Sequence, residues 1–133
     1  MNIKVYLIGD KIPKYFQSAI QEYEKRLSKY CKIKLIEVKN EEALIKVLSS
    51  SSYKILVSKR GTNPSSTELA DKISTLGNTG KSELEIIYGI EHLEVDEILA
   101  ISKMDIDSSL LITILFEQIY RAYRILNNHA YHK

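Results

Sequence analysis

Apolar and polar residues alternate along the chain with two different periods, and the alternation predicts strands interleaved with helices. After the first apolar run, apolar side chains recur at steps of three and four residues from Phe16 to Tyr30, which is the spacing of one helical stripe. Strands that alternate with helices are typical of an α/β fold with a mainly parallel sheet and helices on both faces. Runs rich in β-branched and aromatic residues predict strands at 3–8, 33–38, 53–57 and 84–88.

Capping residues predict where further helices begin. Ser65 and Glu68 have the spacing of a capping box, in which each side chain accepts a hydrogen bond from the other residue's backbone N–H. A short helix is expected from Glu94 to Ile101, and residues 58–61 are expected to form a turn. The other predicted helix starts are Pro13, Asn40, and Asp107 or Ser108, the last of these beginning a helix that runs to about Leu126.

The last predicted helix is apolar on nearly every side. A helix of this kind is buried on more than one face. In a small domain one face should pack on the sheet, and the other is expected to pack on a second copy of the chain. The polar residues of this helix form one narrow stripe, in which Glu117 and Arg121 are spaced for an i,i+4 ion pair.

The composition predicts a single folded domain spanning residues 1–133. Hydrophobic residues make up 44% and charged residues 27%, which is too apolar for a disordered chain. The formal net charge of +2 argues against non-specific coating of nucleic acid, so any RNA contact needs a local patch or a second subunit. Cys31 is the only cysteine, which excludes an internal disulfide and predicts a small buried residue. No run is apolar enough to span a membrane and the start is unlike a signal peptide, so a cytoplasmic protein is expected.

Two glycines mark a place where a ligand could bind. Gly61 and Gly89 come just after predicted strands, and parallel sheets bind small molecules at the carboxyl ends of their strands. The residue types alone still favour the simpler reading that both are turn glycines. The chain contains no P-loop, no dinucleotide-binding glycine motif and no nucleophile elbow. Its three histidines, His92, His129 and His132, lie far from any cysteine cluster, so no metal site is predicted.

The C-terminal tail is the second candidate. Arg121 and Arg124 precede a tail that contains His129, Tyr131 and His132. Such a tail is either a frayed polar end or an RNA-contacting segment, with arginines for phosphates and rings for bases. A further basic cluster around the third strand is expected to be a solvated edge; its members are Lys54, Lys59 and Arg60.

Segments along most of the chain resemble one known family, in the same order. Their combined order is more specific than any single motif, and through it the chain resembles the RlmH family of SPOUT-class ribosomal RNA methyltransferases. The segments are Val5–Lys11, Glu22–Leu27, Lys32–Val38, Lys59–Gly61 with Ser65–Ala70, Ser102–Met104, Glu117–Tyr123 and Ala130–Lys133.

The resemblance implies a fold and an activity. Members of the family have a SPOUT trefoil knot, are homodimers, and bind S-adenosylmethionine in the knot. They methylate N3 of a pseudouridine in large-subunit (23S) ribosomal RNA of assembled ribosomes. No metal is needed, because the sulfonium already provides a leaving group. The expected partners are therefore a second copy of the chain and the ribosome, with no membrane.

The resemblance also assigns site residues. Tyr131 and His132 would position the target base and handle its proton, with Glu91 and His92 as the next places to look. Arg121 and Arg124 are expected to contact RNA phosphates or the dimer partner, and His129 is expected to contact RNA. The cofactor-binding positions would be Val57, Gly61, Tyr88, Gly89, Ile101, Ser102, Lys103, Met104, Asp105 and Ile106.

The chain departs from the family pattern around the expected cofactor site. Tyr88 and His92 stand where glycines are usual, and a tyrosine ring there could narrow the pocket. Asp105 and Asp107 add negative charge, and Ile112 replaces an arginine that many members have. The chain is also shorter between Val38 and Tyr53 and between Leu93 and Ser102.

These departures leave a second hypothesis beside the methyltransferase. It is a catalytically degenerate SPOUT-fold protein that binds RNA or the ribosome and has lost the cofactor. A flavodoxin-like nucleotide-binding protein also fits the order of strands and helices, but it does not account for the C-terminal segments.

Overall fold

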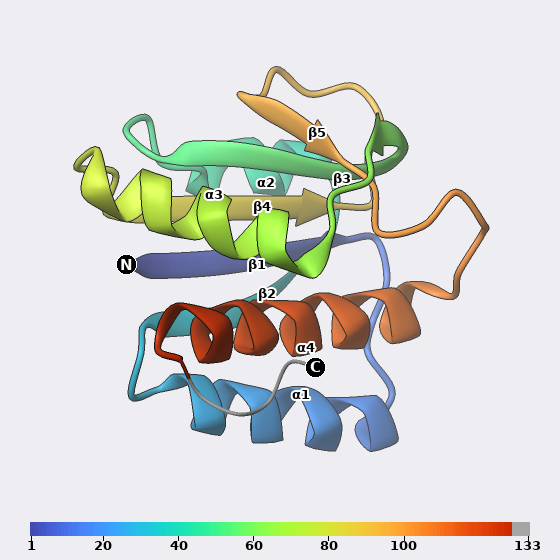
Figure 1. Cartoon of the computed structure of the whole chain (residues 1–133). Coiled ribbons are helices and arrows are strands. Elements are labelled where there is room, and N and C mark those ends of the chain that lie inside the picture. Colours follow the sequence, from blue (N-terminus) through green and yellow to red (C-terminus); the bar gives the residue numbers. More distant parts are fainter. Residues whose placement is uncertain (129–133) are drawn as a thin grey trace.

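The chain forms a parallel sheet covered by helices on both faces, shown in Figure 1 by a computed structural model that describes residues 1–128. In this part of the chain the sheet has five strands in the order β2-β1-β4-β3-β5, and every neighbouring pair is parallel. The strands are β1 (Asn2–Ile8), β2 (Lys32–Val38), β3 (Tyr53–Thr62), β4 (Glu83–Tyr88) and β5 (Glu97–Leu99). The helices are α1 (Lys14–Leu27), α2 (Glu41–Val47), α3 (Ser66–Asn78) and α4 (Ser108–Leu126).

Side chains alternate between the two faces of the sheet. In β1, Ile3, Val5 and Leu7 belong to the large core beneath α1, α3 and α4, whereas Tyr6 and Ile8 belong to a smaller core that Leu44 of α2 completes. This is the period of two expected of strands, and it confirms the predicted α/β fold with helices on both faces. Cys31 is buried in the larger core, as predicted.

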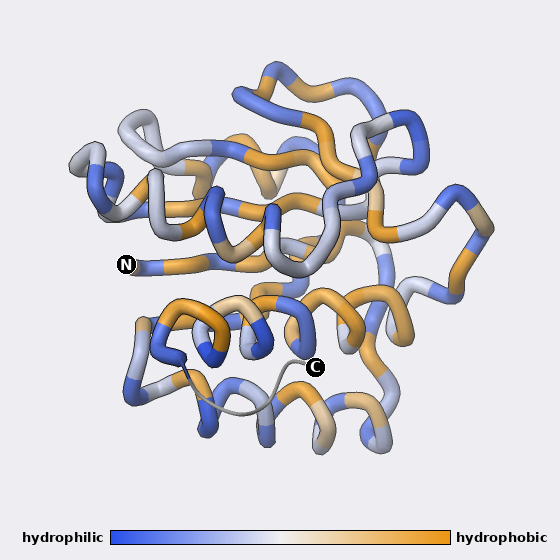
Figure 2. Tube along the Cα trace, viewed as in Figure 1, coloured by the Kyte–Doolittle hydropathy of each residue, from blue (hydrophilic) through white to orange (hydrophobic). Residues whose placement is uncertain are grey.

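Helix α4 buries much of its apolar surface against neighbours in the same chain. It lies between α1 and α3 and packs against both, as well as on the sheet (Figure 2). This packing therefore does not require a second subunit to cover the other apolar side of α4, because α1 and α3 cover its flanks. The predicted ion pair is confirmed, with 2.9 Å between Arg121 Nη2 and Glu117 Oε2.

The predicted helix from Glu94 to Ile101 is wrong. Within it, residues Glu97–Leu99 form β5, which pairs with β3. Ile98 packs with the α2-side core and Leu99 with the other, which is the alternation of a strand. A strand of three residues is too short to show its period, so the apolar positions were taken for a helical stripe.

The predicted turn at residues 58–61 is also wrong, because β3 continues to Thr62. Val57 and Thr62 both pair with Leu99, with a register shift between them, so that residues 57–62 curl over the end of β5. Gly61 makes this approach possible. A Cβ atom there would lie 2.6 Å from backbone atoms of Ile98 and Leu99.

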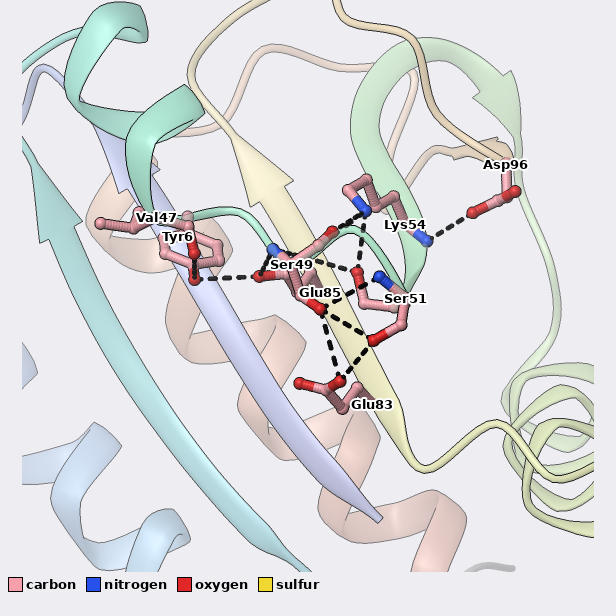
Figure 3. A network of polar contacts seen from close by, with 9 residues as sticks. Tyr6, Val47, Ser49, Ser51, Lys54, Glu83, Glu85 and Asp96 are labelled. Atoms are coloured by element: carbon pink, nitrogen blue, oxygen red, sulfur yellow. Dashed lines mark hydrogen bonds and ion pairs between the residues drawn. The ribbon is translucent and has the colours of Figure 1, made fainter.

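Lys54 is not part of a solvated edge, because it bonds a buried carboxylate (Figure 3). Its Nζ lies 3.7 Å from Oε1 of Glu85, whose residue is 1% exposed, and 3.0 Å from the Ser52 hydroxyl. Glu85 also accepts hydrogen bonds from the Tyr6 hydroxyl and from the Ser49 backbone N–H, each at 3.0 Å. Burial requires such partners, and the serines after α2 supply them.

Candidate functional site

A pocket opens at the carboxyl ends of the central strands. Its walls come from the ends of β3 and β4, the loop after β5 and the first turn of α4. The pocket encloses about 130 Å³ and is lined by Val57, Ser58, Lys59, Tyr88, Glu91, Ile101, Ser102, Met104, Asp105, Ile106 and Leu111. Most of the predicted cofactor residues therefore lie together, although they come from three separate segments.

Three of the predicted cofactor residues do not line this pocket. Gly61 packs under β5, and Gly89 has a φ of +115° with its missing Cβ directed at the backbone oxygen of Ile8. Both glycines are thus required by contacts with the protein's own backbone. Lys103 Nζ donates to the backbone oxygens of Lys59 and Gly61, at 3.3 and 3.2 Å, and so ties the loop after β5 to the end of β3.

Polar contacts hold the rim of the pocket together. Lys59 Nζ lies 2.5 Å from Asp105 Oδ1, which joins β3 to the loop after β5. The Ser58 hydroxyl donates to Glu91 Oε1 at 2.9 Å, and Arg60 Nη2 donates to the Glu91 backbone oxygen at 2.7 Å, which joins β3 to the loop after β4. The three loops therefore form one connected rim.

Several carboxylates lie near the Tyr88 ring, and one of them, Asp105, is paired with Lys59. Burial raises the pKa of the Tyr88 phenol, and the carboxylates of Glu91, Asp10, Asp105 and Asp107 raise it further. Asp107 also caps α4, where its carboxylate accepts hydrogen bonds from the backbone N–H groups of Ser109 and Leu110. An aromatic ring surrounded by carboxylates favours a cationic ligand over an anionic one.

The predicted RNA and catalytic residues do not meet the pocket within one chain. Arg124 lies thirteen residues beyond Leu111 on α4, which places it about 20 Å further along the helix. Its Nε is buried and has no hydrogen-bond partner among residues 1–128. Arg121 bonds Glu117 on the same helix. His129, Tyr131 and His132 lie outside the described residues.

Sequence reasoning missed Ser58, Lys59 and Leu111 as lining residues, and it named Glu91 only as a further candidate for proton handling. Ser58 directly follows the predicted end of a strand, and this position could have suggested it. Leu111 looked like any core residue of an apolar helix. Within residues 1–128, no cluster of three or more His, Cys, Asp or Glu side chains is arranged to hold a metal ion. No helix in that same part of the chain is long and apolar enough to cross a bilayer.

Comparisons with known proteins point to one family. Residues 1–132 match a family model described as "Predicted SPOUT methyltransferase". The chain is 45% identical over 133 residues to ribosomal RNA large subunit methyltransferase H 1 of Thermoanaerobacter sp. (strain X514), covering all of both chains. Proteins named ribosomal RNA large subunit methyltransferase H from Shouchella clausii and Clostridioides difficile are each 35% identical over 159 positions, again covering all of both chains. The Thermoanaerobacter relative aligns with this chain over 133 residues and the full length of both, so it has no additional residues around 38–53 or 93–102. The shortened segments are therefore shared with this relative.

Proposed function

The chain belongs to the SPOUT methyltransferase family, and we propose that it methylates ribosomal RNA of the large subunit, using S-adenosylmethionine to modify N3 of a pseudouridine. The observation that carries the proposal is the pocket at the ends of β3 and β4, which gathers Val57, Tyr88 and Ile101 with most of the other cofactor positions of the family. The protein would act in the cytoplasm, on ribosomes, as a single domain of residues 1–133.

A carboxylate in the pocket supports this cofactor. S-adenosylmethionine carries a sulfonium and an ammonium group, and when bound it would supply an activated methyl group. The carboxylate of Glu91, which lines the pocket, offers a favourable partner for one of these cations. In the overall reaction the methyl–sulfur bond breaks, a methyl–nitrogen bond forms, and the N3 proton leaves for an acceptor, so the residues mainly align the reactants and receive a proton.

The length of α4 supports a site that is built from two protomers. From Leu111 to Leu126, α4 rises about 22 Å away from the pocket. From Asn128 to His132 there are only four residues, which span about 14 Å when fully extended. The tail is therefore too short to bring Tyr131 and His132 back to the pocket of its own chain. We propose a homodimer in which these two residues serve the partner's pocket, positioning the base and handling its proton.

The fold proposed with this function is the SPOUT trefoil knot, and the curl of residues 57–62 over β5 supports it. Leu99 pairs with both Val57 and Thr62, and the chain then continues into the pocket loop and α4. A chain that passes through such a curl is what a SPOUT knot requires.

One observation favours the degenerate alternative. A pocket of about 130 Å³ is smaller than the ~300 Å³ or more that small-molecule sites usually enclose, and Tyr88 occupies part of its wall. Calorimetric titration with S-adenosylmethionine decides between the two. Saturable binding near one equivalent per chain supports the methyltransferase, and absence of binding with retained ribosome binding supports the degenerate protein.

A mixed-dimer experiment tests the shared site. One variant lacks residues 131–133, and the other carries Ile106→Trp, which fills the pocket. Each homodimer should be inactive on ribosomes. Equal amounts of both chains, allowed to exchange subunits, should recover about one quarter of wild-type methylation, because half of the dimers then hold one complete site. No recovery, with exchange verified by mass, would show that the tail serves its own chain.

The tail deletion also tests what the tail does for the fold. It should leave the melting temperature, dimerisation and cofactor binding nearly unchanged. A large fall in melting temperature would instead assign residues 131–133 a structural role.

A further inference from the structure

Cations gather at the end of the sheet opposite the pocket. Lys25, Arg26 and Lys29 lie at the end of α1 or just beyond it, and Lys32 and Lys34 lie at the start of β2. All five are exposed, and no carboxylate interrupts the sequence from residue 25 to residue 36. We call these five residues the α1–β2 basic surface. A concentration of this kind is notable in a chain whose net charge is only +2.

The α1–β2 basic surface is hollowed where its two halves meet. A depression of about 230 Å³ is lined by Lys25, Arg26, Ser28 and Lys29, together with Glu22 and Tyr120. A second, of about 380 Å³, includes Ser28, Lys32 and Lys34 in its lining. Ser28 borders both, so the cations surround one continuous uneven surface. The ion pair of Arg26 with Glu22 is about half exposed and can readily be exchanged for a phosphate contact.

The cations on the rim of the pocket are less available to an RNA strand. Three of them are engaged by the protein itself: Lys59 with Asp105, Arg60 with the backbone oxygen of Glu91, and Lys103 with two backbone oxygens. Carboxylates surround Tyr88 at the same end. RNA phosphates approaching this pocket therefore need cations from elsewhere.

The basic surface lies beside the point where the C-terminal tail leaves α4. Arg26 of α1 and Arg124 of α4 both lie 5.9 Å from the centre of the Tyr120 ring. Tyr30, which follows α1, stacks on Tyr123 of α4 with 5.6 Å between ring centres. Any arrangement that brings the tail of one protomer to the partner's pocket thus brings the basic surface towards the same pocket.

We propose that the α1–β2 basic surface binds phosphates of the ribosomal RNA that enters the pocket of the partner protomer. The inference rests on the proposed function and on the shared site described above. It assigns the two ends of the molecule complementary tasks: the pocket end holds a cationic cofactor, and the basic end of the other protomer holds the polyanionic substrate.

Charge reversal tests the surface directly. Lys29→Glu with Lys32→Glu should weaken binding to ribosomes and to protein-free 23S RNA by about tenfold or more at moderate salt, and should lower the slope of log K against log salt by about 2. Cofactor affinity, melting temperature and dimer mass should not change. The matched control is Lys39→Glu with Lys46→Glu, which alters net charge equally at exposed positions elsewhere.

Equal losses in the two double variants would overturn the proposal, because only total charge would then matter. A loss with ribosomes but none with protein-free RNA would also overturn it, and would assign the surface to a ribosomal protein. Binding to ribosomes and RNA can be measured by sedimentation, which does not depend on catalytic turnover. If the wild-type protein showed no methylation activity, the proposed function would be refuted, but this binding test would remain valid.

A mixed dimer tests which pocket the surface serves. The Lys29→Glu/Lys32→Glu chain keeps an intact pocket, and the Ile106→Trp chain keeps an intact basic surface. If the surface serves the partner, the mixed dimer should methylate ribosomes with a KM close to wild type at about half its kcat, since one site is complete. A KM as high as that of the charge-reversed homodimer would show that the surface serves its own pocket.

Discussion

Tyr88 contributes an aromatic ring to the wall of the pocket. It lines the pocket together with Val57 and Ile106, at a position where the resemblance described above predicts glycine. Protein interiors tolerate little extra volume, so a ring of this size takes space that a bound nucleoside would fill. That Tyr88 narrows the pocket remains a prediction, which cofactor binding can test.

Replacing Tyr88 by glycine should therefore raise the affinity for S-adenosylmethionine. Relief of overpacking is worth roughly 1–3 kcal/mol, which corresponds to about 5- to 150-fold in Kd. Tyr88→Phe is the control, because it keeps the ring and should change little. Equal or weaker binding of Tyr88→Gly in calorimetry would show that the ring instead contributes to holding the cofactor.

Glu85 is the residue whose loss should cost the most stability. Its removal takes the carboxylate acceptor from the Tyr6 hydroxyl and the Ser52 hydroxyl, and the ion partner from Lys54 (Figure 3). Glu85→Ala should lower the free energy of unfolding by about 3–5 kcal/mol in urea titration.

The control for this prediction lies on the same strand. Glu83 bonds the hydroxyls of Ser49 and Ser51 at a more exposed position, and Glu83→Ala should cost less than about 1 kcal/mol. Similar losses for the two variants would contradict a special role for the buried carboxylate.

The network around Glu85 shows where residue patterns stop being informative. The pattern placed Glu85 correctly within a strand and Ser49 within a polar break. It could not pair them, because the Ser52–Glu85 contact joins residues 33 apart in the sequence and depends on how β3 and β4 align. The pocket residues were likewise identified through family resemblance, since their side chains share no local pattern.

At the scale of elements, the signals that reside in a few neighbouring residues were reliable. The capping box of Ser65 and Glu68 is present, the Asn40 side chain accepts from the Ala43 backbone N–H at 2.9 Å, and Asp107 caps α4. Signals that need length were less informative: β5 was missed, and the expectation that one side of α4 packs on the sheet and the other on a partner did not include the contacts with α1 and α3. Neighbours across the fold decide such features, and the sequence does not contain them locally.

The cap of α4 gives a prediction at this scale. Asp107→Ala leaves two backbone N–H groups without their acceptor and should lower the free energy of unfolding by about 1 kcal/mol. Asp107→Asn keeps a capping oxygen and should lose much less. Equal losses in thermal or urea unfolding would mean that the negative charge, and not the cap, is what stabilises the helix start.

At the scale of the whole molecule, exposed apolar side chains gather near the pocket end. Leu110 at the start of α4 is 43% exposed, Tyr15 at the start of α1 is 74% exposed, and Met104 in the pocket loop is 77% exposed. The Ser108 hydroxyl bonds Asp10, which brings the starts of the two helices together. A second copy of the chain would bury this surface.

Sedimentation should therefore give about twice the 15.3 kDa of one chain. Leu110→Asp should shift the protein towards the monomer, because it places a charge in the surface that the dimer would bury. Ile45→Asp is the matched control, since Ile45 is 56% exposed on α2 at the opposite face of the sheet. A wild-type protein that sediments as a monomer at micromolar concentration would exclude the shared site.

The curl of residues 57–62 over Leu99 also sets an order of events during folding. Pairings β1–β2 and β1–β4 can form without β5. Strand β5 pairs in its native register only once residues 57–62 have curled, because Leu99 pairs with both Val57 and Thr62 and the Gly61 backbone directly contacts the backbone of Ile98 and Leu99. The pocket should thus be the last part of the molecule to become native. A refolding chain should regain its helices well before it regains the ability to bind a ligand.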